Sequence, residues 1–333
     1  MRIVLSALFL FSCHILYCTA VPGWAVLVAG SKAWIRYRHQ SNVCNMYQIL
    51  RAQGFPKEKI ITFMYDDIAN NTLNPRPTEI INEPNGPNLY HNIDIDYKGT
   101  NVNKENLFKV LIGDTSSGGK VVKGGRTQNV FLYYTGLGDE SGEFTMSHST
   151  EGYIKNTEFI EILKQVSVKN PFYRMFIAFE ASHSGMIFEE ILPTKMKVIV
   201  MTAGATDEDT HGAFCEDPKF KTCLAGVFSY HFSQFLKKND LSKSTIFDLY
   251  NYVRQASKVH HPQLYGQLEA GHMPLRAFMK YKTSVGFMGV GASESNEVDI
   301  NEEESNEVDI NEEESNEVDM NILIHWNSMA RIP

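Results

Sequence analysis

Short apolar runs alternate with amphipathic segments between residues 22 and 290. The runs are "WAVLVAG" (24–30), "IITFMY" (60–65), "NVFLYYT" (129–135), "RMFIAFEA" (174–181) and "KVIVMTAG" (197–204). Runs with so few polar interruptions are typical of strands that are buried on both faces of a parallel sheet. Helical patterns lie between and after them, over 41–53, 104–112, 156–168, 225–238 and 244–258. The alternation predicts an α/β fold with a largely parallel central sheet and helices on both faces.

The two ends of the chain do not follow this alternation. Residues 1–20 combine Arg2, an apolar run and small residues near Ala20, which predicts a secretory signal peptide, with a membrane anchor as the alternative. At the other end, "ESNEVDINEE" occurs at 294–303 and again at 304–313, and a third copy begins at 314. Such acidic repeats bury almost no apolar surface and repel themselves. We therefore expect a signal peptide over 1–20, a folded domain over 22–290 and a disordered acidic tail over 291–333.

The formal net charge of −8 comes from the tail. Residues 294–321 hold 13 acidic residues and no Lys or Arg, and without them 26 acidic residues face 31 Lys and Arg. The remaining chain is mildly basic, but it has no Lys/Arg cluster with interleaved aromatic residues, so nucleic-acid binding is not expected. Beyond the signal segment, no stretch approaches the roughly 18 consecutive apolar residues of a membrane helix, so no membrane span is expected after signal cleavage.

Cysteine usage and one sequence motif also bear on the compartment. The five cysteines are Cys13, Cys18, Cys44, Cys215 and Cys223. The first two lie in the signal segment, and three remaining thiols do not make a disulfide framework. Cys215 and Cys223 can pair in an oxidising compartment, but their spacing leaves the pairing open. No Cys-x-x-Cys pair is present, so neither a structural zinc ion nor another cofactor is expected. Asn70-Asn71-Thr72 is an N-glycosylation acceptor.

The loops after the strands carry the candidate functional residues, since ligands of α/β folds gather at the carboxyl ends of the strands. Arg36, Arg38 and His39 follow the first run and precede a helix, which suits an anion or carboxylate, or alternatively a solvated basic loop. "TGLGDESG" (135–142) follows the third run but lacks the Gly-Lys-Ser/Thr of a phosphate-binding loop. The fourth run ends in "FIAFEASHSG" (176–185), which presents Ser182 as a candidate nucleophile.

Several segments together resemble the legumain family of asparaginyl endopeptidases. They are, in chain order, "WAVLVAGS", "YRHQSNVCNMYQIL", "MYDDIANNTLNPRP", "IINEPNGPNLYHNIDIDYKGTNV", "LIGD", "FEASHSG" and "HPQLYG". The resemblance spans about residues 24–280 and fades in the later part. It implies a caspase-like sheet with helices on both faces, in agreement with the alternation of runs.

The resemblance also implies a catalytic cysteine, a histidine base and an asparagine that orients the histidine. At the matching positions this chain has Ser182, Leu137 and Arg36. A thiol reaches its nucleophilic form at neutral pH after a modest pKa perturbation, whereas a serine hydroxyl depends on a neighbouring base. His183 is adjacent to Ser182, where neighbouring side chains diverge, and no spacing requires His148 to fold back. We therefore expect a catalytically inactive protein.

The family's substrate pocket is only partly kept. The resemblance assigns substrate contacts to Arg38, His39 and Glu180, which are present. The family's paired serines correspond to Asp209 and Thr210, and its pocket aspartate falls near Ala225. The retained residues have two interpretations: Arg38 and Glu180 form an ion pair that braces the sheet, or the pocket still binds peptides.

Three functional hypotheses follow. The first is a pseudoenzyme, secreted or delivered to a lysosome or vacuole, that binds peptides or an active legumain-like protease. The second is an active asparaginyl endopeptidase or other hydrolase that uses Ser182 in place of the cysteine. The third is an interaction or antigenic scaffold that presents the acidic repeat.

Overall fold

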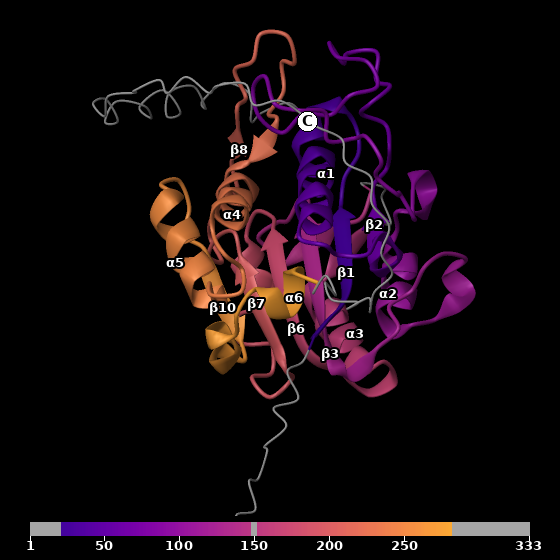
Figure 1. Ribbon diagram of the computed structural model, residues 1–333, viewed down its shortest axis with the longest axis vertical. Helices are drawn as coiled ribbons and strands as arrows, with labels where there is room; N and C mark the ends of the chain where they lie inside the picture. The colour runs from indigo at the N-terminus through magenta and orange to yellow at the C-terminus, as the bar shows by residue number, and fades with distance from the viewer. Residues whose placement is uncertain (1–20, 148–151, 282–333) are drawn as a thin grey trace, which may run out of the picture. The chain divides into compact units, whose positions relative to one another are not determined.

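The computed structural model describes residues 21–147 and 152–281, all within one compact unit, Met1–Tyr281. Its centre is a six-stranded sheet in the order β10-β7-β6-β3-β1-β2 (Figure 1). The strands are β1 (Val21–Ala29), β2 (Ile60–Phe63), β3 (Gly125–Thr135), β6 (Phe172–Glu180), β7 (Val198–Thr202) and β10 (Gln263–Gly266). The predicted signal peptide (1–20) and acidic tail (291–333), together with His148, lie outside the described residues.

The sheet is parallel except at one edge. β2, β1, β3, β6 and β7 pair in parallel, and β10 pairs antiparallel with β7. Parallel strands need crossover connections, which the helices supply. The helices are α1 (Tyr37–Ala52), α2 (Lys104–Ile112), α3 (Asn156–Lys169), α4 (Val227–Lys238), α5 (Ile246–Ala256) and α6 (Arg276–Met279). The predicted α/β class with a largely parallel sheet is confirmed.

Apolar residues on both faces of the strands bury the sheet between two layers of helices. Alternate residues of one strand, such as Phe176 and Ile177 of β6, belong to opposite cores because successive side chains point to opposite faces. The core that contains Phe176 includes residues of α1, α4, α5 and α6, and the core that contains Ile177 includes residues of α2 and α3 (Figure 1). The strands have near-continuous apolar runs in the sequence because both of their faces are buried.

Local signals in the sequence fix several helix ends. Asn103 accepts a hydrogen bond from the Asn106 N–H at the start of α2, and Gly113 ends that helix in the left-handed conformation. Thr245 and Asp248 form a reciprocal capping box at the start of α5. In contrast, α1 begins after Arg36 without a side-chain cap.

Two short hairpins and two short 3-10 helices follow the carboxyl ends of the strands. β4 (Glu143–Thr145) pairs with β5 (Tyr153–Lys155), and β8 (Gly212–Ala213) pairs with β9 (Ala225–Gly226). The short 3-10 helix η1 (Trp34–Arg36) leads into α1, and η5 (Ser184–Ile187) follows β6. The further 3-10 helices are η2 (Lys57–Lys59), η3 (Gly99–Asn101), η4 (Thr115–Ser117) and η6 (Leu268–His272). Within residues 21–147 and 152–281, no helix is long and apolar enough to cross a membrane.

Candidate functional site

The parallel pairing of β3 with β6 brings two predicted catalytic positions together. Thr135 and Glu180 are partners in the register, so the chain segments that follow them leave the sheet side by side. The approach is close: a Cβ atom on Gly138 would lie 2.3 Å from the Ser182 carbonyl oxygen. Leu137, which precedes Gly138, therefore lies beside the Ser182 turn. Its hydrocarbon side chain cannot accept a proton.

Ser182 is half-buried, and its hydroxyl is engaged by the backbone of a neighbouring loop. The Thr210 N–H donates to Ser182 Oγ across 3.1 Å. His183 has a left-handed backbone (φ 53°), and its ring lies against the same loop. His183 Nδ1 is 2.9 Å from the Thr206 carbonyl oxygen, and Nε2 is 3.7 Å from Asp209 Oδ1. Both ring nitrogens of His183 are thus placed against groups other than Ser182 Oγ.

Arg36, the residue at the third predicted catalytic position, lies at the end of η1. Arg36 and Arg38 are both half-buried, and neither guanidinium forms a hydrogen bond or ion pair with another residue of the described chain. Burial lowers the pKa of Arg36. Burial also lowers the pKa of Arg38, to about 10, while Glu180 acts in the opposite direction and Arg36 adds to the decrease. The predicted alternative of an Arg38–Glu180 ion pair is therefore not realised within 4 Å.

Glu180 is buried, and its carboxylate joins three elements of the fold. Oε2 accepts hydrogen bonds from Asn42 Nδ2 (2.9 Å) on α1, Thr135 Oγ1 (2.9 Å) at the end of β3 and Ser229 Oγ (2.6 Å) on α4. Oε1 accepts from the Ser229 N–H at 3.2 Å. Burial raises the pKa of Glu180, and the hydrogen bonds from Ser229 and Thr135 oppose that rise. A Cβ at position 226 would lie 2.1 Å from Oε1, so Gly226 lets the β9 backbone approach the carboxylate.

His39 lies in the first turn of α1 and is fully buried. Its Nδ1 is 2.6 Å from Ser31 Oγ, and its Nε2 has no hydrogen-bond partner among the described residues. Burial lowers the pKa of His39 well below its usual range, and Arg38 and Arg36 lower it further. A neutral imidazole at this place can orient neighbouring groups but carries no positive charge at neutral pH.

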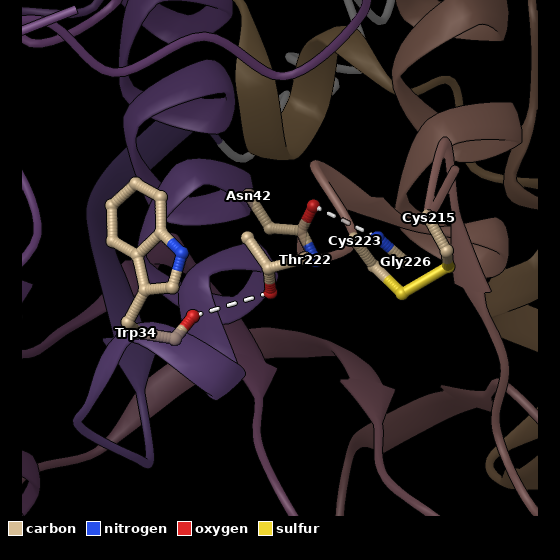
Figure 2. Close-up of a disulfide and its surroundings, with 6 residues drawn as sticks. All are labelled: Trp34, Asn42, Cys215, Thr222, Cys223 and Gly226. Atoms are coloured by element: carbon tan, nitrogen blue, oxygen red, sulfur yellow. Dashed lines mark hydrogen bonds between the residues drawn. A yellow bond between two sulfur atoms is a disulfide. The ribbon is translucent and has the colours of Figure 1, made fainter. Parts of the chain in front are cut away.

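A loop closed by the disulfide Cys215–Cys223 lies next to η1 and α1 (Figure 2). Cys215 and Cys223 are bonded, which resolves the pairing that the spacing left open. Figure 2 shows two hydrogen bonds that hold this segment to α1 and η1. Thr222 Oγ1 of the loop donates to the Trp34 carbonyl oxygen at 3.2 Å, and the N–H of Gly226, in the strand β9 that follows the loop, donates to Asn42 Oδ1 at 3.3 Å. The Trp34 ring is also stacked on Phe220 of the loop. Cys44 is buried as a free thiol.

The structure thus brings the predicted residues into two groups. Ser182 and Leu137 lie together where β6 and β3 end, while Arg36, Arg38 and His39 lie at the start of α1, which Asn42 connects to Glu180. Asn70 is exposed. Within the described ranges, no three or more His, Cys, Asp or Glu side chains are grouped so that they could hold a metal ion.

Reasoning from the sequence missed two groups of this site. Asn42 and Ser229 supply three of the four hydrogen bonds to Glu180. Both are short polar residues in otherwise buried helix positions, and a buried polar residue within an apolar helix face is the signal that could have indicated them. The Thr210 N–H could not have been found in this way, because every residue other than proline has this group.

Similarity to known proteins covers most of the described chain. A profile of the peptidase C13 family matches residues 23–282. A hemoglobinase of Schistosoma mansoni is 38% identical over 255 residues, which are 77% of this chain and 58% of that protein. A vacuolar-processing enzyme of Ricinus communis is 37% identical over 270 residues, which are 78% of this chain and 54% of that protein. The chain spans between half and two thirds of the length of these relatives. Among solved structures, caspase-1 of Spodoptera frugiperda has 10% sequence identity and a TM-score of 0.46, over 75% of this chain and 88% of that one.

We expect Glu180→Gln to destabilise the protein by about 3 kcal/mol, because one carboxylate oxygen would become an NH₂ group that faces hydrogen-bond donors in a buried place. Chemical denaturation measures the change in the free energy of unfolding. Glu269→Gln, at an exposed position, is the matched control and should change it by less than about 0.5 kcal/mol. Equal effects of the two substitutions would contradict the role given to the Glu180 carboxylate.

We expect the free energy of unfolding to depend on pH through Glu208, which lies in the loop beside Ser182. Glu208 accepts hydrogen bonds from the N–H groups of Ala205 (2.9 Å) and His261 (2.8 Å) and also contacts the His261 ring. Burial raises the pKa of Glu208, but these hydrogen bonds lower it by more, so the pKa lies below its ordinary value of 4.5. The stabilisation is therefore present above about pH 4.5 and is lost as the pH falls through the lower pKa of the folded protein.

Glu208→Gln should accordingly lower the melting temperature most at about pH 7 and progressively less toward about pH 3. Thermal unfolding followed by circular dichroism across this range measures the difference. Glu216→Gln, an exposed position in the disulfide loop, serves as the control and should show little effect at any pH. A Glu208→Gln deficit that stays constant down to about pH 3 would count against the ionised contact.

Proposed function

This chain belongs to the peptidase C13 family, and from that premise we propose that it is a catalytically inactive member which binds peptides, or an active protease of the same family, without cleaving them. The observation that carries the proposal is the surroundings of Ser182. Its hydroxyl accepts the Thr210 N–H, and the neighbouring Leu137 cannot take a proton from it. Opening an amide bond with a serine requires a base that removes the hydroxyl proton during attack.

The imidazole closest in sequence does not support the alternative of a serine hydrolase. His183 Nδ1 lies against the Thr206 carbonyl oxygen, and its Nε2 faces the Asp209 carboxylate. To act on Ser182 the ring would have to leave both groups. Replacement of the nucleophile, the base and the orienting residue together removes the machinery rather than altering it.

Retained recognition groups support peptide binding. Arg38 is unpaired among the described residues, and Glu180 is held in a fixed position by its hydrogen bonds. A binding site needs fixed polar groups of this kind and does not need a nucleophile. The proposal therefore separates recognition, which the fold still supports, from bond cleavage, which it does not.

The secretory route, with a lysosome, a vacuole or the extracellular space as destination, is part of the same proposal. The relatives include proteins named vacuolar-processing enzymes, and disulfides such as Cys215–Cys223 persist in oxidising compartments. The Asn70 acceptor is exposed, as a glycan requires.

Inactivity is tested with a blocked fluorogenic asparaginyl peptide at about pH 5 and about pH 7. We expect no turnover by the wild-type protein and none by Ser182→Cys, because a thiol alone still lacks its base. The triple variant Ser182→Cys, Leu137→His, Arg36→Asn should gain measurable hydrolysis. Turnover by the wild-type protein that disappears in Ser182→Ala would overturn the proposal in favour of a serine hydrolase.

Glycosylation is tested by expression through a eukaryotic secretory pathway. The wild-type protein should lose mass on treatment with an N-glycosidase, and Asn70→Gln should show no such loss. Asn71→Gln is a matched control, since it changes the neighbouring residue and keeps the Asn-x-Thr acceptor. An unmodified wild-type protein, or a glycan that persists in Asn70→Gln, would argue against Asn70 as the site.

A further inference from the structure

Two half-buried arginines at the start of α1 have no partner in the described chain. The other half-buried arginines each have an acceptor for the guanidinium group. Arg76 pairs with Glu79, and Arg174 donates to the Tyr173 carbonyl oxygen at 3.0 Å. Arg36 and Arg38 make no such contact with their guanidinium groups. A guanidinium carries five N–H donors and a permanent charge, so partial burial without an acceptor is costly. That cost is offset when a ligand supplies the acceptor.

The nearby carboxylates of this chain are already engaged. Glu180 accepts hydrogen bonds from Asn42, Thr135 and Ser229, and four donors occupy its two oxygens. Asp67 accepts from the Ala33 N–H at 2.8 Å and from Gln40 Nε2 at 2.6 Å. Asp209 is exposed and faces His183. None of them lies within 4 Å of either arginine, and Glu180 acts on the pKa of Arg38 only from a longer distance, so the N–H donors of both guanidinium groups are left for a ligand.

The backbone adds to this preference for an anion. α1 begins at Tyr37 without a side-chain cap, and its first turn contains no acidic residue. The N–H groups at the start of a 16-residue helix and its dipole therefore favour negative charge next to the two arginines. Arg38 and Asn42 are one helical turn apart on α1, and Asn42 contacts Glu180, so Arg38 lies on the side of the helix that faces the ends of β3 and β6.

We propose that Arg36 and Arg38 bind a carboxylate of a peptide, so that the site selects an acidic residue over asparagine. This proposal rests on the peptide binding proposed above and specifies its ligand. Guanidinium and carboxylate groups are complementary in charge and in hydrogen-bond geometry, whereas an asparagine side chain offers no charge and one acceptor oxygen. The carboxylate can belong to an aspartate side chain or to a peptide C-terminus.

The test uses fluorescence anisotropy of the full chain with three labelled peptides. Two are blocked at both ends and differ only by a central Asp or Asn, and the third contains Asn and has a free C-terminal carboxylate. We expect the blocked Asp peptide to bind roughly tenfold more tightly than the blocked Asn peptide, with a difference that shrinks at high salt. Tight binding of the third peptide instead of the Asp peptide would assign the site to a C-terminus, which still supports a carboxylate site.

Substitutions identify the residues responsible. Arg36→Gln and Arg38→Gln should each abolish most of the Asp-over-Asn preference, and Arg36→Lys should keep part of it. Arg126→Gln, an exposed arginine near the opposite end of β3, should leave the preference unchanged. A thermal unfolding scan identifies variants that fail to fold, and the comparison of peptides on the wild-type protein does not depend on any variant.

The outcomes separate this proposal from the proposed function. Equal binding of all three peptides would overturn the carboxylate site and leave non-cleaving peptide binding in place. A preference for Asp that Arg126→Gln removes as strongly as Arg36→Gln would also overturn it. Binding of none of the peptides would overturn the carboxylate site and peptide binding together, and cleavage of the Asn peptide would overturn inactivity alone.

Discussion

The arrangement of the site depends on one buried carboxylate. Glu180 ends the central strand β6, and its oxygens accept hydrogen bonds from α1, from the end of β3 and from α4. A buried charge is tolerated only where donors surround it, so those three elements must stay in place around Glu180 for the domain to remain folded. The segments that carry Leu137, Ser182 and the two arginines begin within a few residues of these anchors.

This constraint is compatible with the proposed loss of catalysis, because the architecture around Glu180 does not depend on the three predicted catalytic positions. The groups that hold Glu180 are structural, and none of the positions Ser182, Leu137 and Arg36 contributes a hydrogen bond to it. Under the proposed function, changes at those three positions would alter the chemistry without opening the network. The strand β9, which follows the disulfide loop, is attached to the same network, because the Gly226 N–H donates to Asn42 Oδ1.

Most of the fold could be predicted from the sequence because two-sided burial leaves a strong pattern. The five apolar runs match β1, β2, β3, β6 and β7 to within a few residues. β10 was missed because Gln263–Gly266 is a half-buried edge strand with no continuous apolar run. α1 begins at Tyr37 rather than at 41, since its first turn is polar and lacks a capping residue that would have marked the start. The predicted start of α5, at 244, lies within two residues of its observed start at Ile246, where Thr245 and Asp248 form a capping box.

The sequence predicted where in the fold the site residues lie, but it did not predict which hydrogen bonds they form. Motif spacing placed Ser182 and Leu137 at strand ends, and the sheet register brings those ends together. The sequence could not show whether Arg38 pairs with Glu180, because several side chains in the fold could donate hydrogen bonds to that carboxylate. In the structure the donors are Asn42, Thr135 and Ser229. The bond from the Thr210 N–H to Ser182 Oγ depends on a loop path that no side-chain pattern encodes.

The central claim is that the Ser182 hydroxyl lacks a proton acceptor and is therefore not nucleophilic. Its most direct measurement is intact-protein mass spectrometry after incubation with a fluorophosphonate, which phosphonylates activated serines, with peptide mapping of any adduct. The account predicts that Ser182 remains unmodified under conditions that label a serine hydrolase to completion. Stoichiometric labelling at Ser182 would contradict it.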